Sequence, residues 1–311
     1  MRRSSGGCSF NTNPRQPMSS PSQAPHPVFC LISDERVFAF RSTAVFRHII
    51  DKMQIPASYV PFQVEAKQLG HAIASLRVLH IAGANVAVPY KEAVIPYMDA
   101  LSESANIIGA VNTIAIKNNQ AKGYNTNAIG IMDALEDAGF APAGKTALIL
   151  GAGGAAKAVA FVLQWLKAER IYIAGRNRDR AASVASRSGG VPLSFGDLAD
   201  APMQAELLVN ATSISSAAES PEMDKFSRDF TVDGCELVFD LNYGREPNIW
   251  QALARDRDIA FMDGLSPLVH HARNSLALWT SREINAADIA GAINAKNPYL
   301  LLHRPPKADG P

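Results

Sequence analysis

The sequence predicts an α/β fold with two domains, and three observations support this prediction. Its 311 residues exceed the size of most single domains, so two packed domains are expected. Hydrophobic residues make up 47% and charged residues 19% of the chain, which is the composition of a globular protein. From Pro27 onward, short apolar runs alternate with helical periodicity, a pattern typical of βαβ units around mostly parallel sheets.

The first third of the chain provides the elements of an N-terminal domain. Apolar residues recur at helical spacing from Val94 to Ile108, which predicts one helix over residues 91–108, beginning just after Pro89. The other expected elements are strands at residues 28–33, 58–64 and 83–88 and helices at residues 43–53 and 66–79.

A small β ribbon and a helix lead into the second domain. The ribbon, residues 111–116 and 122–124, flanks Asn118-Asn119, because asparagine tolerates the positive φ of a hairpin turn. The second domain begins near a helix over residues 125–139, which ends at a glycine. Its expected elements are strands at 146–150, 170–174, 207–210 and 237–241, helices after the first two, and a helix at 268–279.

Charge and cysteine content indicate a small-molecule partner. A net charge of +1 gives no basic excess for nucleic acid or a membrane surface, and the longest apolar stretch is too short to span a bilayer. Cys8, Cys30 and Cys235 match neither a disulfide framework nor a metal site, and adjacent His270 and His271 cannot face one metal from a helix. We therefore expect no metal, a reducing cytoplasmic location, and a monomer or homodimer.

Both ends of the chain are expected to lie outside the folded domains. Residues 1–26 lack the apolar core of a secretory signal and are predicted to be a disordered extension. This stretch contains no acidic residue, so a transit peptide is an alternative that its prolines disfavour, and Met18 is a candidate start. Residues 297–311 are proline-rich and are predicted to be a loose tail.

A glycine-rich turn, Leu-Ile-Leu-Gly-Ala-Gly-Gly-Ala-Ala at residues 148–156, joins an expected buried strand to an apolar helix. This is the G-x-G-x-x-A pattern of dinucleotide sites in the context that it requires. Gly151 allows the tight turn, Gly153 lets the backbone approach a pyrophosphate, and Ala156 lets helix and strand pack closely. The alternative is an ordinary strand-to-helix turn without a ligand.

The end of the next strand indicates which dinucleotide binds. Residues 175–180 read Gly-Arg-Asn-Arg-Asp-Arg, with no acidic residue at the strand end where an NAD site usually carries one. Arg176 and Arg180 are four residues apart and can hold a 2′-phosphate from two sides. NADP(H) is therefore the expected cofactor, and the alternative is a solvated basic turn in which these arginines cap Asp179.

Lys91 directly follows an expected strand, and Pro89 fixes the turn between them. A lysine at this place can protonate a carbonyl oxygen as hydride arrives, provided that a cleft lowers its pKa. Spacing alone does not separate this role from that of a solvated lysine at a helix start.

Three segments resemble motifs of the shikimate dehydrogenase family. Residues 83–91 resemble G-x-N-V-T-x-P-x-K, residues 109–113 resemble G-A-V-N-T, and residues 123–130 resemble G-x-N-T-D-x-x-G. The resemblance continues in the family's order over roughly residues 28–290. It implies a substrate-binding domain at residues 27–125 with returning helices at 266–296, and a Rossmann-like, doubly wound NADP(H)-binding domain at 126–265.

The resemblance also assigns roles to single residues. Lys91 would be the catalytic lysine and Asn112 a ligand of a substrate hydroxyl. Ser42 matches one of two serines that hold the substrate carboxylate, and Tyr243 lies near the substrate. The implied cofactor site consists of Gly151, Ala152, Gly153, Gly154, Ala155, Arg176, Asn177, Arg180, Thr212 and Gly264.

The substrate end departs from the family pattern, whereas the cofactor end does not. An amide in place of the catalytic aspartate can orient a hydroxyl but gives the lysine no opposite charge, so the lysine should lose its proton more easily. Asn127 is still expected to be a catalytic and substrate-binding residue and His271 a substrate-binding one, although a lone helical histidine is often structural. The departures are Phe40 for a serine, Ala87 for the motif threonine, Asn127 for the aspartate, His271 for a glutamine, and Ser266-Pro267 for Gly-Met.

These observations predict an NADP(H)-dependent oxidoreductase that interconverts a ketone and a secondary alcohol on a small cyclic hydroxy acid. The resemblance makes shikimate and 3-dehydroshikimate, of the pathway to aromatic amino acids, the first substrates to test. The alternative is a weakly active or inactive family member that binds NADP(H) and a metabolite as a sensor or interaction protein.

Overall fold

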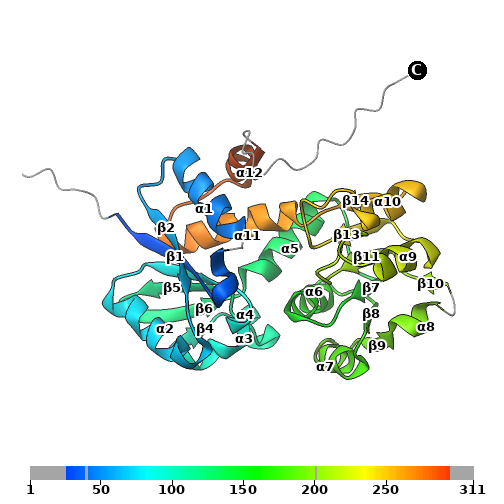
Figure 1. Ribbon diagram of the computed structural model, residues 1–311, viewed down its shortest axis with the longest axis horizontal. Coiled ribbons are helices and arrows are strands. Elements are labelled where there is room, and N and C mark those ends of the chain that lie inside the picture. The colour runs from blue at the N-terminus through cyan, green and yellow to red at the C-terminus, as the bar shows by residue number, and fades with distance from the viewer. Residues whose placement is uncertain (1–25, 39–40, 200–201, 295–311) are drawn as a thin grey trace, which may run out of the picture.

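A computed structural model describes residues 26–38, 41–199 and 202–294. It is an α/β protein whose two lobes are each built on a six-stranded sheet, which confirms the predicted fold class (Figure 1). The expected extension as far as residue 25, the position of Phe40 and the expected tail at 297–311 lie outside the described residues. In the described part of the chain, no helix has the length and apolar character needed to cross a membrane.

The first lobe contains a mixed sheet in the order β2-β1-β3-β5-β6-β4. Strands β2, β1 and β3 are parallel, β5 is antiparallel to β3 and β6, and β4 is parallel to β6. The expected ribbon is therefore one part of a larger sheet. The strands are β1 (Val28–Ser33), β2 (Ser58–Gln63), β3 (Gly83–Val86), β4 (Ala100–Leu101), β5 (Thr113–Lys117) and β6 (Gln120–Tyr124), and the helices are η1 (Glu35–Phe38), α1 (Arg41–Lys52), η2 (Ala66–Gln68) and α2 (Leu69–Val78).

The prediction of one helix over residues 91–108 is wrong. The chain forms α3 (Tyr90–Ala93), η3 (Ile95–Tyr97), β4 and α4 (Glu103–Ile108) instead. Pro96 has no N–H to continue a helix, and Met98 is extended. The Asp99 carboxylate then accepts a hydrogen bond from the backbone N–H of Ala121 at 2.6 Å, and β4 pairs with β6. Pairing with the sheet therefore overrides the helical spacing of the apolar residues.

The second lobe contains an all-parallel sheet in the order β14-β13-β11-β7-β8-β9. Chain order reverses at β7, so the sheet is doubly wound, as in a Rossmann-like domain. The four predicted strands are its centre, and β9 and β14 at the edges were not predicted. Its elements are α5 (Thr126–Asp137), β7 (Thr146–Leu150), α6 (Gly154–Trp165), β8 (Arg170–Gly175), α7 (Arg178–Ser188), β9 (Val191–Ser194), α8 (Phe195–Ala199), β11 (Leu207–Asn210), α9 (Pro221–Asp229), β13 (Leu237–Asp240), α10 (Ile249–Asp256) and β14 (Ala260–Met262), with a separate pair β10 (Met203–Gln204) and β12 (Val232–Asp233).

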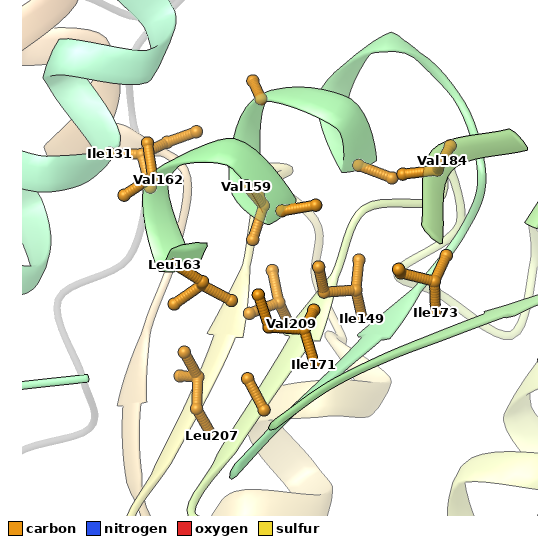
Figure 2. Packing of buried hydrophobic residues seen from close by; sticks show 14 of the residues in the cluster. Ile131, Ile149, Val159, Val162, Leu163, Ile171, Ile173, Val184, Leu207 and Val209 are labelled. Carbon is orange, nitrogen blue, oxygen red and sulfur yellow. The ribbon is translucent and has the colours of Figure 1, made fainter. Parts of the chain in front are cut away.

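Helices α5 and α6 cover one face of the second sheet. Figure 2 shows Val159 and Leu163 of α6 above Ile149 and Val209 of the sheet, with Ile131 of α5 beside them. These residues are almost fully buried, so the apolar faces of the helices and the sheet form one core. This packing fixes the start of α6 at the carboxyl end of β7.

The last two helices return to the first lobe (Figure 1). Helix α11 (Leu265–Thr280) lies along α5, and α12 (Ala286–Asn294) packs against α1. Near the end of α11, Trp279 stacks on Phe29 of β1 with ring centroids 4.7 Å apart and donates a hydrogen bond from Nε1 to the carbonyl of Ile114 at 2.9 Å. The far end of α11 is thereby anchored in the core of the first lobe.

Replacing Trp279 with alanine is expected to lower the free energy of unfolding by about 3–5 kcal/mol, because it empties a buried aromatic site and leaves a carbonyl without its donor. Urea unfolding followed by circular dichroism measures this change. Trp165→Ala is the matched control, since Trp165 is 51% exposed. Equal destabilisation by both variants would contradict the anchoring role of Trp279.

Candidate active site

The glycine-rich turn between β7 and α6 has the geometry of a dinucleotide-binding loop. Gly151 has a φ of +117°, and a Cβ there would lie 2.8 Å from the carbonyl oxygen of Ala211. The turn therefore requires glycine at this position. A Cβ on Gly153 or Gly154 would meet nothing within 4 Å, so the start of α6 is open to a ligand.

A cavity of about 280 Å³ lies at this turn, and we call it the cofactor cavity. The side chain of Asn177 caps α7 by accepting a hydrogen bond from the backbone N–H of Arg180 at 3.0 Å. Arg176 and Arg180 are exposed, and within the described ranges neither forms an ion pair with Asp179 or another acid. The cavity is lined by seven of the predicted cofactor residues, Gly151, Ala152, Gly153, Arg176, Asn177, Arg180 and Thr212.

A second cavity of about 190 Å³ adjoins the start of α6, and we call it the substrate cavity. Ala155 and Gly264, two further predicted cofactor residues, line this cavity rather than the first. Asn127, Tyr243 and His271 also line it, so the structure brings together three of the predicted substrate-binding residues.

Close contact between α5 and α11 places Asn127 and His271 on facing helices. A Cβ on Gly130 of α5 would lie 2.6 Å from the carbonyl oxygen of Pro267 on α11, so only a glycine allows this approach. Helix α5 begins next to Asn127, because the side chain of Asn125 accepts a hydrogen bond from the backbone N–H of Ala128 at 3.1 Å.

A hydrogen-bond network joins these residues below the substrate cavity. Asn112, which is 3% exposed, donates from Nδ2 to Oδ1 of Asn127 at 2.6 Å, and the same nitrogen lies 3.4 Å from Nδ1 of His271. The hydroxyl of Thr126 lies 2.7 Å from the same Nδ1. Asn112, Asn127 and His271 therefore belong to one polar cluster, although the sequence places them far apart.

His271 is neutral at physiological pH. Burial and the nearby positive charge of Lys91 lower the pKa of its imidazole to about 3. Its ring meets the edge of Phe46 with centroids 5.6 Å apart, which excludes water from that side. His271 is therefore available as a hydrogen-bonding group and not as a proton carrier near pH 7.

Lys91 is the second residue of the short helix α3, which follows the strand β3. Burial lowers the pKa of its ammonium, and in the described portion of the chain it forms no ion pair. Its neighbour Glu92 instead pairs with Lys157 of α6 at 2.5 Å, which links the two lobes beside the catalytic candidate. A lysine with a lowered pKa near a cavity has the property that general acid–base chemistry requires.

Four of the predicted site residues, Ser42, Lys91, Asn112 and Gly154, line neither of the two cavities. Ser42 on α1 is partly buried, and Ala87 packs at the edge of the first-lobe core. Sequence reasoning missed Thr126, which connects Asn112 to His271. Its place between two motif asparagines at the start of a helix was the available signal, because a hydroxyl there either caps the helix or meets a neighbouring polar group.

Comparison with known proteins agrees with this geometry. The family model described as the shikimate dehydrogenase substrate binding domain matches residues 36–114, and the model described as shikimate / quinate 5-dehydrogenase matches residues 135–252. The shikimate dehydrogenase (NADP(+)) of Moorella thermoacetica is 40% identical over 74% of this chain and 80% of its own.

Solved structures show the same arrangement. The crystal structure of shikimate dehydrogenase from Aquifex aeolicus superposes with a TM-score of 0.76 at 26% identity, over 88% of this chain and 99% of that one. Shikimate 5-dehydrogenase from Thermus thermophilus, in complex with NADP(H) and shikimate, gives a TM-score of 0.73 at 26% identity, over 86% and 98% of the chains. The chain described here belongs to the shikimate dehydrogenase family.

Proposed function

We propose that this protein is an NADP(H)-dependent oxidoreductase that interconverts 3-dehydroshikimate and shikimate or a closely related cyclic hydroxy acid. One observation carries the proposal: a cavity with Asn127 and His271 on its wall, close to Lys91, adjoins the cofactor cavity at the start of α6. The relatives named as NADP-dependent shikimate dehydrogenases support the choice of substrate and cofactor.

The residues of the cofactor cavity fit NADP(H). Gly151 and Gly153 allow the backbone to approach a pyrophosphate at the start of α6, and Arg176 and Arg180 would hold the 2′-phosphate. When bound, the cofactor supplies a hydride to the substrate carbon or accepts one from it. Thr212 lines the same cavity, whereas Ala155 and Gly264 would lie where it meets the substrate cavity.

The chain's own residues would then handle the substrate and its proton. Lys91 would donate a proton to the carbonyl oxygen in reduction and accept it in oxidation. Asn112 and Asn127 would orient substrate oxygens, and Ser42 and Tyr243 would hold the far side of the ring.

The same proposal includes the roles of the two domains, the cellular location and the oligomeric state. Residues 27–125 with the returning helices at 266–296 would bind substrate, and residues 126–265 would bind NADP(H). The described cysteines, Cys30 and Cys235, are free thiols, which supports a reducing, cytoplasmic location. We propose a monomer or homodimer that acts on a small molecule and not on nucleic acid.

Initial rates of NADP⁺ reduction with shikimate, quinate and related hydroxy acids test the proposal. Turnover of shikimate, with a strong preference for NADP⁺ over NAD⁺, is the expected result. Measurable NADPH binding without turnover of any compound would overturn it and favour a binding protein instead.

A pH profile tests the role of Lys91 in a second way. Because burial lowers the pKa of Lys91 from its ordinary value of 10.5, kcat/KM for alcohol oxidation is expected to rise through a midpoint below that value. Reduction requires the protonated form, so its kcat/KM is expected to fall through the same midpoint.

Asn127→Asp would place a carboxylate beside His271, within reach of the Lys91 charge, and raise the midpoint by about one pH unit. Asn106→Asp adds the same charge at an exposed site on α4 and is the matched control. A midpoint at the ordinary lysine value, or one that both variants shift equally, would contradict the assignment.

A further inference from the structure

The orientation of the Asn112 amide is fixed by the backbone. The N–H of Thr126 donates to Oδ1 of Asn112 at 2.8 Å. Because a backbone N–H can only donate, Oδ1 must face Thr126, and Nδ2 must face the opposite way, toward Asn127 and His271. This contact fixes the direction of the hydrogen bonds that Asn112 makes.

The two hydrogens of Asn112 Nδ2 determine which atoms of Asn127 and His271 face Asn112. One hydrogen points to Oδ1 of Asn127 at 2.6 Å, so the Asn127 amide turns its oxygen inward and its Nδ2 away from Asn112. The other faces Nδ1 of His271 at 3.4 Å. That ring nitrogen therefore faces a group that can only donate, and it must accept.

A buried chain of polar side chains gives the same direction. Asn85 donates from Nδ2 to the hydroxyl of Thr113 at 3.0 Å, and Thr113 lies 2.7 Å from the hydroxyl of Thr126, which lies 2.7 Å from Nδ1 of His271. Since an amide Nδ2 can only donate, the Thr113 hydroxyl accepts from Asn85 and can donate to Thr126. The Thr126 hydroxyl has two acceptors, Oδ1 of Asn112 at 3.2 Å and Nδ1 of His271 at 2.7 Å, and the nearer one is the histidine nitrogen. The phenol of Tyr59 holds the start of this chain by donating to Oδ1 of Asn85 at 2.8 Å.

With Nδ1 accepting, the neutral imidazole of His271 carries its hydrogen on Nε2. Among the described residues Nε2 has no hydrogen-bond partner, and the side chain lines the substrate cavity together with Asn127. The lowered pKa of the ring agrees with a group that stays neutral while its one Nδ1 lone pair accepts a hydrogen bond.

We propose that this network makes the wall of the substrate cavity a pair of fixed N–H donors, Nδ2 of Asn127 and Nε2 of His271, which select the keto form of the substrate. The proposal rests on the function proposed above and deepens it. A carbonyl or carboxylate oxygen only accepts hydrogen bonds, so two N–H donors satisfy it. An alcohol also has a hydrogen to donate, and this wall offers no acceptor for that hydrogen. In the family pattern a carboxylate at position 127 would accept that hydrogen. Thr126 acts here as a positioning residue.

The tautomer of His271 tests the proposal without any substrate. Nitrogen-15 spectra of the full chain with labelled histidine, assigned by comparison with His271→Gln, report which ring nitrogen carries hydrogen. We expect the neutral Nε2–H form to persist from roughly pH 8 to pH 5, because the charged group that faces the ring is Lys91. An Nδ1–H form, or protonation near the ordinary histidine pKa, would overturn the proposal.

Two variants separate positioning from folding. Thr126→Val removes the hydroxyl but keeps the backbone N–H and the shape, so only the longer 3.4 Å contact of Asn112 still favours Nδ1 as an acceptor, and part of the Nε2–H population is expected to convert to the Nδ1–H form. Thr126→Ser restores the hydroxyl and is expected to restore the wild-type spectrum. Identical spectra for the valine variant and the wild type would show that the threonine chain does not set the tautomer.

Ligand selectivity provides the second readout. Calorimetric dissociation constants are measured for 3-dehydroshikimate with NADP⁺ and for shikimate with NADPH, two complexes that cannot react. Asn127→Asp supplies an acceptor and is expected to shift the ratio of the two constants by about tenfold toward the alcohol. Asn106→Asp is the control, and an unchanged ratio in Asn127→Asp would overturn the keto preference. If neither compound binds, the proposed function is contradicted. The nitrogen-15 spectrum of His271 is then the one remaining test of the donor arrangement.

Discussion

Lys91→Ala is expected to lower kcat for shikimate oxidation by about 10²- to 10⁴-fold while NADPH binding changes less than about twofold. The residue lies outside the cofactor cavity, and its charge reaches His271 on the wall of the substrate cavity. Loss of the side chain removes the group that exchanges a proton with the substrate oxygen. Initial rates and fluorescence titration with NADPH measure the two effects separately.

Lys91→Arg sharpens this test, because arginine keeps the positive charge but does not release its proton near neutral pH. We expect it to be nearly as inactive as the alanine variant. Lys67→Ala, at a side chain that is 76% exposed, is the matched control and should retain full activity. Turnover by Lys91→Arg close to the wild-type rate would show that the lysine supplies only charge.

Replacing both Arg176 and Arg180 with alanine is expected to weaken NADPH binding by at least about 100-fold while NADH binding hardly changes. Each guanidinium would form charge-assisted hydrogen bonds with the 2′-phosphate, and one such contact contributes about 1.5–3 kcal/mol. NADH has no phosphate at that position and would lose nothing. Titration of the protein with each cofactor gives the two dissociation constants.

The matched control for the arginine pair is Arg178→Ala, since Arg178 lies between them and pairs with Asp197 at 4.0 Å. We expect this variant to bind NADPH as the wild type does. An equal loss of affinity for NADPH and NADH in the double variant would mean that the arginines stabilise the turn. They would then not be the residues that select NADP(H) over NAD(H).

The dinucleotide turn could be predicted because its requirements are local. A strand, a glycine at positive φ and a helix start follow one another within a few residues, so the pattern around Gly151 carries the whole geometry. The helix over residues 91–108 could not be read in the same way. Short helical turns and strand β4 all place apolar residues toward one core, and Pro96 was the signal against a continuous helix.

The grouping of Asn127 with His271 was predictable only through the family resemblance. These residues are far apart in sequence, and they meet because Gly130 lets α5 and α11 approach closely. The direction of their hydrogen bonds was beyond prediction altogether, since it depends on a backbone N–H of Thr126 aimed at a buried amide. Edge strands β9 and β14 were missed because they are short and partly exposed.

The contact at Gly130 restrains the relative motion of helices α5 and α11. At Gly130 the two helices approach with no side chain between them, so a slide of α5 along α11 would bring their backbones into collision there. One end of this helix pair is fixed to the first sheet by Trp279, and the pair carries Asn127 at the start of α5 and His271 within α11. Helix α5 also packs in the core of the second sheet, so the pair joins the two lobes and holds these two side chains between them. The position of the substrate-binding side chains and that of the cofactor cavity are therefore tied to one common support.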